Sequence, residues 1–230
     1  MRYDLNKRVW EIDAARGLCV LGMVVIHFIY DLNWKLGSNI PVFGLNYGSA
    51  FFILICGISS LFSRSNIKRG LYVLLLGLGI TVVSRLYFIF IGDSDYSAIY
   101  FGILHLLGTL MILYHLVFRK LNNVWIIILT ALILAAWPFL GGINLPHLWL
   151  FGITDNNFAS YDYFPLIPHT AYFLIGVIIG RTVYKEKKSR APYIPAARPL
   201  IWMGLHTLVI YLVHQPLFLG VMYVYELLIR

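Results

Sequence analysis

His27 and Asp31 lie four residues apart in "RGLCVLGMVVIHFIYDL", a stretch that is otherwise apolar enough to cross a membrane. At this spacing the two side chains share one face of a helix. A carboxylate there can accept the proton of one imidazole nitrogen and leave the other nitrogen basic, as in an oriented general base. Because ionisable groups are costly at membrane depth, the pair predicts His27 and Asp31 as catalytic residues. The structural alternative places Asp31 at the outer interface and bonds His27 to a neighbouring helix.

Other polar residues are expected in the middle and outer half of the same membrane region. Arg85 should lie at the depth of Asp31, about 22 Å from the cytoplasmic boundary, where it either pairs with Asp31 or binds a substrate carbonyl or carboxylate. His214 and Gln215 precede a proline in "LVHQP", and a proline kink often borders a cavity. With His105, nearer the outer face, these residues are predicted to bind substrate.

Two segments between apolar runs could hold ligands at the membrane surfaces. Asp162 stands among tyrosines and prolines in "SYDYFPLIPHTAYFLIG", which suits a polar vestibule for a hydroxylated or amine ligand. The alternative is an aromatic interface belt. The basic run "GRTVYKEKKSRAPYIPAARP" could hold a phosphorylated donor, although for this run taken alone positive-inside charge and contact with anionic lipid are the stronger explanation. No metal site is predicted.

The composition determines what must position these residues. The chain has 230 residues, of which 60% are hydrophobic and 12% charged, and its mean hydropathy is +0.79. These values are typical of integral membrane proteins and exclude an ordinary soluble globular domain. The net charge of +8 comes from short basic clusters between apolar runs, which indicates membrane topology and a lipid bilayer as partner, with no nucleic acid.

The hydropathy pattern predicts an all-α, polytopic membrane helix bundle that forms a single domain over residues 1–230. The first apolar run is expected to be a retained helix, because a secretory signal would not carry His27 and Asp31. About seven transmembrane helices are expected. They are placed at roughly 16–34, 47–63, 70–91, 99–118, 124–140, 165–184 and 200–227.

Lysine and arginine alternate between the predicted loops. The amino-terminal segment and every second loop are rich in these residues, whereas the loops between them carry almost none. By the positive-inside rule the amino terminus is cytoplasmic and the carboxyl terminus extracytoplasmic. The expected location is the plasma membrane, as a multi-pass protein.

Arg16 and His27 are separated by ten residues, and Arg-x10-His in a first span resembles the signature of membrane acyltransferases that modify extracytoplasmic sugars. A wider match resembles the bacterial branch of the heparan-α-glucosaminide N-acetyltransferase catalytic-domain family. It covers essentially the whole chain and is carried, in order, by "WEIDAARGLCVLGMVVIHFIYDL", "FFILICGISSLFSRSNIKRG", "YFGILHLLG", "DYFPLIPHTAYFLIG" and "LVIYLVHQP".

The resemblance implies transfer of an acetyl or other acyl group from cytoplasmic acyl-CoA to an amine or hydroxyl acceptor, often a sugar, outside the membrane. The chain would then be an N- or O-acetyltransferase that uses acetyl-CoA as co-substrate and holds no permanent cofactor. Arg16 would hold the donor's phosphates, and His27 would deprotonate the acceptor or carry the acyl group itself. The chain is small for this family, so a second copy that completes the cavity wall is a candidate partner.

Two other functions use the same residue types. A proton-coupled transporter also needs histidine, aspartate and arginine within its spans, and it is the main alternative. A membrane cytochrome could use helical histidines such as His105 and His214 as haem ligands. Consumption of acyl-CoA separates the first alternative from an enzyme, and a visible-range spectrum tests the second.

Overall fold

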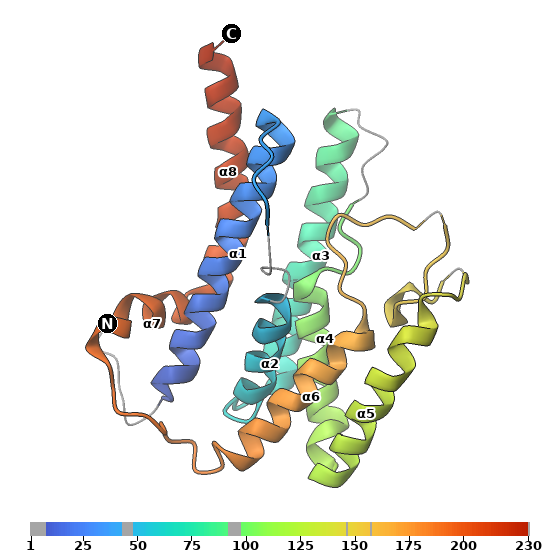
Figure 1. Ribbon diagram of the computed structural model, residues 1–230, viewed down its shortest axis with the longest axis vertical. Helices are drawn as coiled ribbons and strands as arrows, with labels where there is room; N and C mark the ends of the chain where they lie inside the picture. The colour runs from blue at the N-terminus through green and yellow to red at the C-terminus, as the bar shows by residue number, and fades with distance from the viewer. Residues whose placement is uncertain (1–7, 43–47, 92–97, 146, 157, 230) are drawn as a thin grey trace. The chain divides into compact units, whose positions relative to one another are not determined.

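The computed structural model describes residues 8–42, 48–91, 98–145, 147–156 and 158–229, and it is all-α (Figure 1). The only β pairing in these ranges is an isolated bridge between Phe101 and Tyr163. The chain divides into two compact units, one formed by residues 1–55 and 184–230 and the other by residues 56–183. The prediction of one domain over residues 1–230 stays a prediction.

The first unit contains α1 (Trp10–Leu36), α7 (Arg198–Leu205) and α8 (Thr207–Ile229), with the short 3-10 helix η4 (Pro195–Ala197) before α7. The second unit contains α3 (Asn66–Ile91), α4 (Ile103–Leu116), α5 (Asn123–Leu140), α6 (Leu166–Thr182) and the 3-10 turns η2 (Phe118–Lys120) and η3 (Trp149–Phe151). α2 (Gly48–Ser60) begins in the first unit and ends in the second.

A helix occupies each of the segments that hydropathy selected. Within the described ranges, four helices are long and apolar enough to cross a membrane: Trp10–Leu36, Asn66–Phe90, Asn123–Leu140 and Thr207–Tyr225. In the last three, 11% of the most apolar window is buried inside the protein, as expected of helices whose apolar surfaces face lipid. The remaining apolar helices, α2, α4 and α6, are shorter. The number of spans and the sides on which the termini lie therefore stay predictions.

The segment predicted as one span over 200–227 is two helices. α7 ends at Leu205, the backbone angles of the next residue, His206 (φ −107°, ψ 16°), leave the helical region, and α8 begins at Thr207. The His206 imidazole Nδ1 lies 2.8 Å from the Trp202 carbonyl oxygen, and the Thr207 hydroxyl donates to the Gly204 carbonyl at 2.9 Å. The Trp202 carbonyl also accepts the His206 amide at 3.1 Å, and the Thr207 hydroxyl provides a side-chain donor for the last turn of α7.

Glycines let α1 and α7 pack backbone against backbone. A Cβ atom added to Gly17 would overlap the Leu200 carbonyl oxygen, and one added to Gly204 would overlap the Asp13 carbonyl oxygen. Near this contact, Trp10 of α1 packs with Ile201 of α7, and its indole N–H donates to the Ala191 carbonyl at 3.1 Å. Small residues at a crossing allow this approach in membrane proteins, where apolar side chains gain little by leaving lipid.

Gly204→Ala is expected to destabilise the protein by about 1–3 kcal/mol, because the added methyl forces α7 away from α1. The measurement is the unfolding midpoint of the purified protein in detergent. Gly22→Ala is the matched control, since a Cβ at this position of α1 meets nothing within 4 Å. Equal unfolding midpoints for the two variants would contradict the close contact.

Glycine contacts also hold the second unit together. A Cβ on Gly108 of α4 would lie 2.8 Å from the Gly70 carbonyl oxygen of α3, and one on Gly57 of α2 would overlap the Phe173 carbonyl oxygen of α6. Phe173 itself is fully buried. Arg181, at the end of α6, donates to the carbonyls of Leu121 and Phe118 at 2.6 and 2.9 Å. The turn η2, which follows α4, is thereby fixed against the end of α6.

Candidate active site

His27 of α1 and His214 of α8 form a direct contact within the first unit. His27 Nδ1 lies 2.7 Å from His214 Nε2, and the rings stack with centroids 5.0 Å apart and planes inclined by 26°. His214 is buried, with 7% of its surface exposed, whereas His27 is partly exposed. Phe218 packs its ring edge against His214, with centroids 6.0 Å apart. Residues far apart in sequence thus meet in a histidine pair.

The backbone of α8 determines which nitrogen of each ring carries hydrogen. His214 Nδ1 lies 2.7 Å from the Tyr211 carbonyl oxygen, and a carbonyl only accepts, so Nδ1 is the donor. With both rings neutral, His214 Nε2 is then an acceptor and His27 Nδ1 must be the donor to it. This leaves a lone pair on His27 Nε2, for which the described residues supply no hydrogen-bond partner. His27 therefore presents one basic nitrogen.

Asp31 has a different partner from the one that the sequence suggested. Its carboxylate oxygens each accept a hydrogen bond from Gln215 Nε2 at 3.0 Å, and Asp31 is 2% exposed. The spacing of four residues puts His27 and Asp31 side by side on α1, and both reach across to α8 rather than to each other. In the structure, the partner of the His27 Nδ1 atom is His214, and not Asp31 as predicted.

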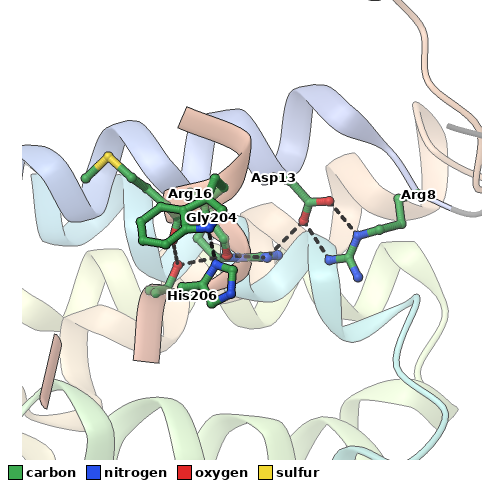
Figure 2. A network of polar contacts seen from close by, with 8 residues as sticks. Arg8, Asp13, Arg16, Gly204 and His206 are labelled. Carbon is green, nitrogen blue, oxygen red and sulfur yellow. Dashed lines mark hydrogen bonds and ion pairs between the residues drawn. The ribbon is translucent and has the colours of Figure 1, made fainter. Parts of the chain in front are cut away.

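A second polar cluster lies where α1 meets α7 (Figure 2). Arg8 donates to both oxygens of Asp13, from Nε at 2.7 Å and from Nη2 at 3.0 Å. Arg16 Nη1 donates to Asp13 Oδ1 at 3.0 Å and to the Gly204 carbonyl at 3.3 Å. Asp13 is buried, with 4% of its surface exposed, so one carboxylate holds two guanidinium groups. The three side chains carry a net charge of +1.

The second unit surrounds His105 with hydrogen bonds. The Gly102 amide donates to His105 Nδ1 at 3.2 Å, so the opposite nitrogen, Nε2, carries hydrogen and faces the Thr81 hydroxyl oxygen at 3.2 Å. The Thr81 hydroxyl in turn donates to the Ile99 carbonyl. Both ring nitrogens of His105 are thus engaged inside the fold, and a substrate or a haem iron would have to displace one of these bonds. Binding by His105 stays a prediction.

Asp162 lies at the beginning of α4, in the segment that precedes α6. Its Oδ2 accepts the Ile103 amide proton at 3.2 Å, and a Cβ on Gly102 would overlap the same oxygen. Burial raises the pKa of Asp162 to about 6, although the hydrogen bond from Ile103 acts in the opposite direction. Asp162 therefore titrates near neutral pH and holds the two segments together.

The raised pKa of Asp162 predicts a pH dependence of stability. The folded protein holds the Asp162 proton up to about pH 6, whereas the ordinary aspartate pKa is 3.8, so the folded state binds more protons between these values. Stability should fall as the pH rises from about 4 to 6 and stay lower above that range. Asp162→Asn should remove this part of the dependence. Unfolding midpoints at pH 5 and pH 7 test it; equal pH slopes for both proteins would contradict it.

The structure brings some of the predicted residues together. The contacts between α1 and α8 join His27 to His214 and Asp31 to Gln215. At the start of α4, His105 binds the Gly102 amide and Asp162 binds the amide of the next residue, Ile103. Arg85 lies on α3 in the other unit with an exposed side chain, and its pairing with Asp31 stays a prediction.

Sequence reasoning missed Asp13, Thr81 and the Tyr211 carbonyl. Asp13 carried a usable signal, because it precedes Arg16 by three residues in "DAAR" and therefore lies on the same helix face. Thr81 and Tyr211 gave no comparable signal. Their roles depend on neighbours brought close by the packing of helices.

Comparison with known proteins gives one match. The family model described as heparan-alpha-glucosaminide N-acetyltransferase, catalytic, matches residues 8–216. The match begins at Arg8, includes the cluster around Asp13 and the histidine pair, and ends at Pro216, just after Gln215. No curated protein and no solved structure matches the chain.

Proposed function

Because the chain belongs to the heparan-alpha-glucosaminide N-acetyltransferase catalytic family, we propose that it moves an acyl group across the membrane. The family is one of membrane acetyltransferases that use acetyl-CoA. The donor would be acetyl-CoA, or another acyl-CoA, on the cytoplasmic side. The acceptor would be an amine or hydroxyl group on the other side of the membrane. We expect this group to belong to a sugar. The observation that carries the proposal is the basic Nε2 of His27, on a candidate membrane span, which has no hydrogen-bond partner in the part of the chain that the structure describes.

His27 Nε2 is the nitrogen at which acyl transfer would be catalysed. In a one-step route it takes the proton of the acceptor while the acceptor nitrogen or oxygen bonds to the thioester carbon. The C–S bond then breaks, and the CoA sulfur leaves with the proton that His27 returns. In a two-step route Nε2 itself bonds to the acyl carbon, and the C–S bond breaks so that CoA leaves as a thiolate. The acceptor then bonds to the acyl carbon and displaces the imidazole, whose Nε2 takes the acceptor's proton and passes it to the CoA thiolate. Both routes need the same free nitrogen.

The cluster of Arg8, Asp13 and Arg16 is the proposed position of the donor's phosphates. Its net positive charge supports this role, and arginine is well suited to bind phosphate oxygens. Arg16 and His27 are eleven residues apart on one helix, which corresponds to about 16 Å along its axis. An extended pantetheine arm bridges a distance of this order. The thioester would then reach His27 while the phosphates stay at the cytoplasmic surface.

The remaining predicted residues belong to the acceptor side in this proposal. Asp31 and Gln215 lie one turn beyond His27 and could bind the acceptor's amine or hydroxyl groups. Arg85, His105 and Asp162 belong to the second unit, and their binding of substrate stays a prediction. The expected setting is the plasma membrane, with multiple spans and with a second copy of the chain as a candidate partner.

A proton-coupled transporter is the second candidate, because a histidine pair beside a buried aspartate could also relay protons. One experiment separates the two functions. Purified protein in detergent is mixed with radiolabelled acetyl-CoA and a panel of amino sugars and neutral sugars, and CoA thiol release and acetylated product are measured. Acceptor-dependent CoA release in equal amount to acetylated product supports the enzyme. In vesicles, uptake of a labelled sugar with no CoA release would overturn it in favour of transport.

A further inference from the structure

We infer that His214 is a positioning residue, which holds the His27 ring in the tautomer and orientation that leave Nε2 as the reactive nitrogen. The inference rests on the proposed function, because it assigns to His214 a role in the same reaction. The sequence alone suggested that His214 binds substrate and that Asp31 orients His27. The contacts in the first unit reverse these assignments.

Both ring nitrogens of His214 are already hydrogen-bonded, so neither is available to a substrate. Its Nδ1 donates to the Tyr211 carbonyl and its Nε2 accepts from His27, each at 2.7 Å. It is also buried, with Phe218 against its ring. A substrate could reach His214 only by breaking one of these bonds, whereas Nε2 of His27 needs no such rearrangement.

His214 also determines the tautomer of His27. A free neutral imidazole can carry its hydrogen on either nitrogen, and only the Nδ1–H form has a lone pair on Nε2. Because the Tyr211 carbonyl fixes the hydrogen of His214 on Nδ1, His214 Nε2 can only accept while the ring is neutral. It therefore selects the Nδ1–H form of His27. The backbone of α8 thus sets the reactivity of a side chain on α1.

The contact between the two rings also matters during proton transfer. When His27 Nε2 takes the acceptor's proton, His27 becomes an imidazolium that still donates from Nδ1 to His214 Nε2. That bond becomes charge-assisted and strengthens as the positive charge develops. No proton needs to move on to His214, so the Tyr211 bond stays intact throughout. The hydrogen bond between the two rings is therefore kept throughout the proton transfer.

Two amide substitutions at position 214 separate positioning from simple filling of space. In His214→Gln the side-chain oxygen can lie near the former Nε2 position and accept from His27, although the bond to Tyr211 is lost. In His214→Asn the amide nitrogen can lie near the former Nδ1 position and donate to Tyr211, but the side chain is too short to reach His27. Both residues are neutral amides of similar polarity.

We expect kcat for acetyl transfer to fall at least about tenfold further in His214→Asn than in His214→Gln, with KM for acetyl-CoA unchanged in both. Nitrogen NMR of protein labelled with 15N-histidine should show His27 as a single Nδ1–H tautomer in the wild-type protein and in His214→Gln. It should show a mixture of tautomers in His214→Asn. The His27 signals are assigned by their loss in His27→Gln.

The outcomes distinguish this inference from the proposed function. Equal kcat values in the two amide variants, or a single Nδ1–H tautomer of His27 in His214→Asn, overturn the positioning role while leaving the acyltransferase in place. Full acetyl transfer by His27→Gln overturns the proposed role of His27, and the positioning role falls with it. A rise in KM for the acceptor with unchanged kcat would return His214 to substrate binding and also overturn the inference.

Discussion

Replacing His27 by glutamine is expected to lower the rate of acetyl transfer by about 10²–10⁴-fold, the usual contribution of a general base. Glutamine is a neutral residue of similar reach, so the packing between α1 and α8 should survive. It has no basic nitrogen and cannot accept a proton or an acyl group. The loss should therefore appear in kcat, while binding of acetyl-CoA, measured by calorimetry, stays unchanged.

The control for this variant is His115→Gln, which makes the same chemical change on α4, outside the histidine pair. It should retain wild-type kcat. The two variants should also share the unfolding midpoint of the wild-type protein to within a few degrees. If His27→Gln retains wild-type kcat, or if His115→Gln loses as much, then His27 is not the reactive group.

Asp13→Asn is expected to lower the free energy of unfolding by about 3–5 kcal/mol, the usual cost of removing one partner from a buried ion pair. Asp13 is buried and accepts from both Arg8 and Arg16, and the Arg16 side chain is 14% exposed. An asparagine leaves the Arg16 charge without its carboxylate beside the closely packed backbones of α1 and α7. Denaturant titration of the purified protein in detergent measures the change.

Glu186→Gln is the control for Asp13→Asn, because it removes a carboxylate whose contact with Arg190 is exposed to solvent on both sides. Such surface pairs contribute about 0–1 kcal/mol, so this variant should unfold close to the wild-type midpoint. If the two variants lose equal stability, the Asp13 cluster does not behave as a buried ion pair.

The helices could be predicted from the sequence because their signal is local. Long apolar runs separated by basic clusters located each helix, and in the structure Gly37, with a left-handed φ of 64°, ends α1 where the apolar run gives way to polar residues. The break at His206 could not be predicted, because Trp202, His206 and Thr207 interrupt the helix with little change in hydropathy. The short length of α2 and α4 could not be predicted from hydropathy either, because apolar residues continue beyond the ends of these helices.

The sequence named His27, Asp31, His214 and Gln215 as candidates, and the contacts between them could not be predicted from it. The free-energy cost of placing ionisable side chains inside a membrane was enough to select His27, Asp31 and His214. Their partners depend on the rotation of α8 against α1, which places His214 opposite His27 and Gln215 opposite Asp31. A spacing of four residues on one helix shows that two side chains share a face, and it carries no information on what the facing helix presents. The reactive nitrogen of His27 could be identified only with the Tyr211 carbonyl in place.

Acyl transfer from one side of a membrane to the other is the central claim, and reconstituted vesicles test it most directly. Radiolabelled acetyl-CoA is added outside vesicles that contain the protein and hold the panel of amino and neutral sugars inside, with His27→Gln vesicles in parallel. We expect labelled acetylated sugar to appear inside the wild-type vesicles, with CoA released outside, and none in the variant. Labelled product that forms only when donor and acceptor share one compartment would contradict the account, as would equal product in His27→Gln vesicles.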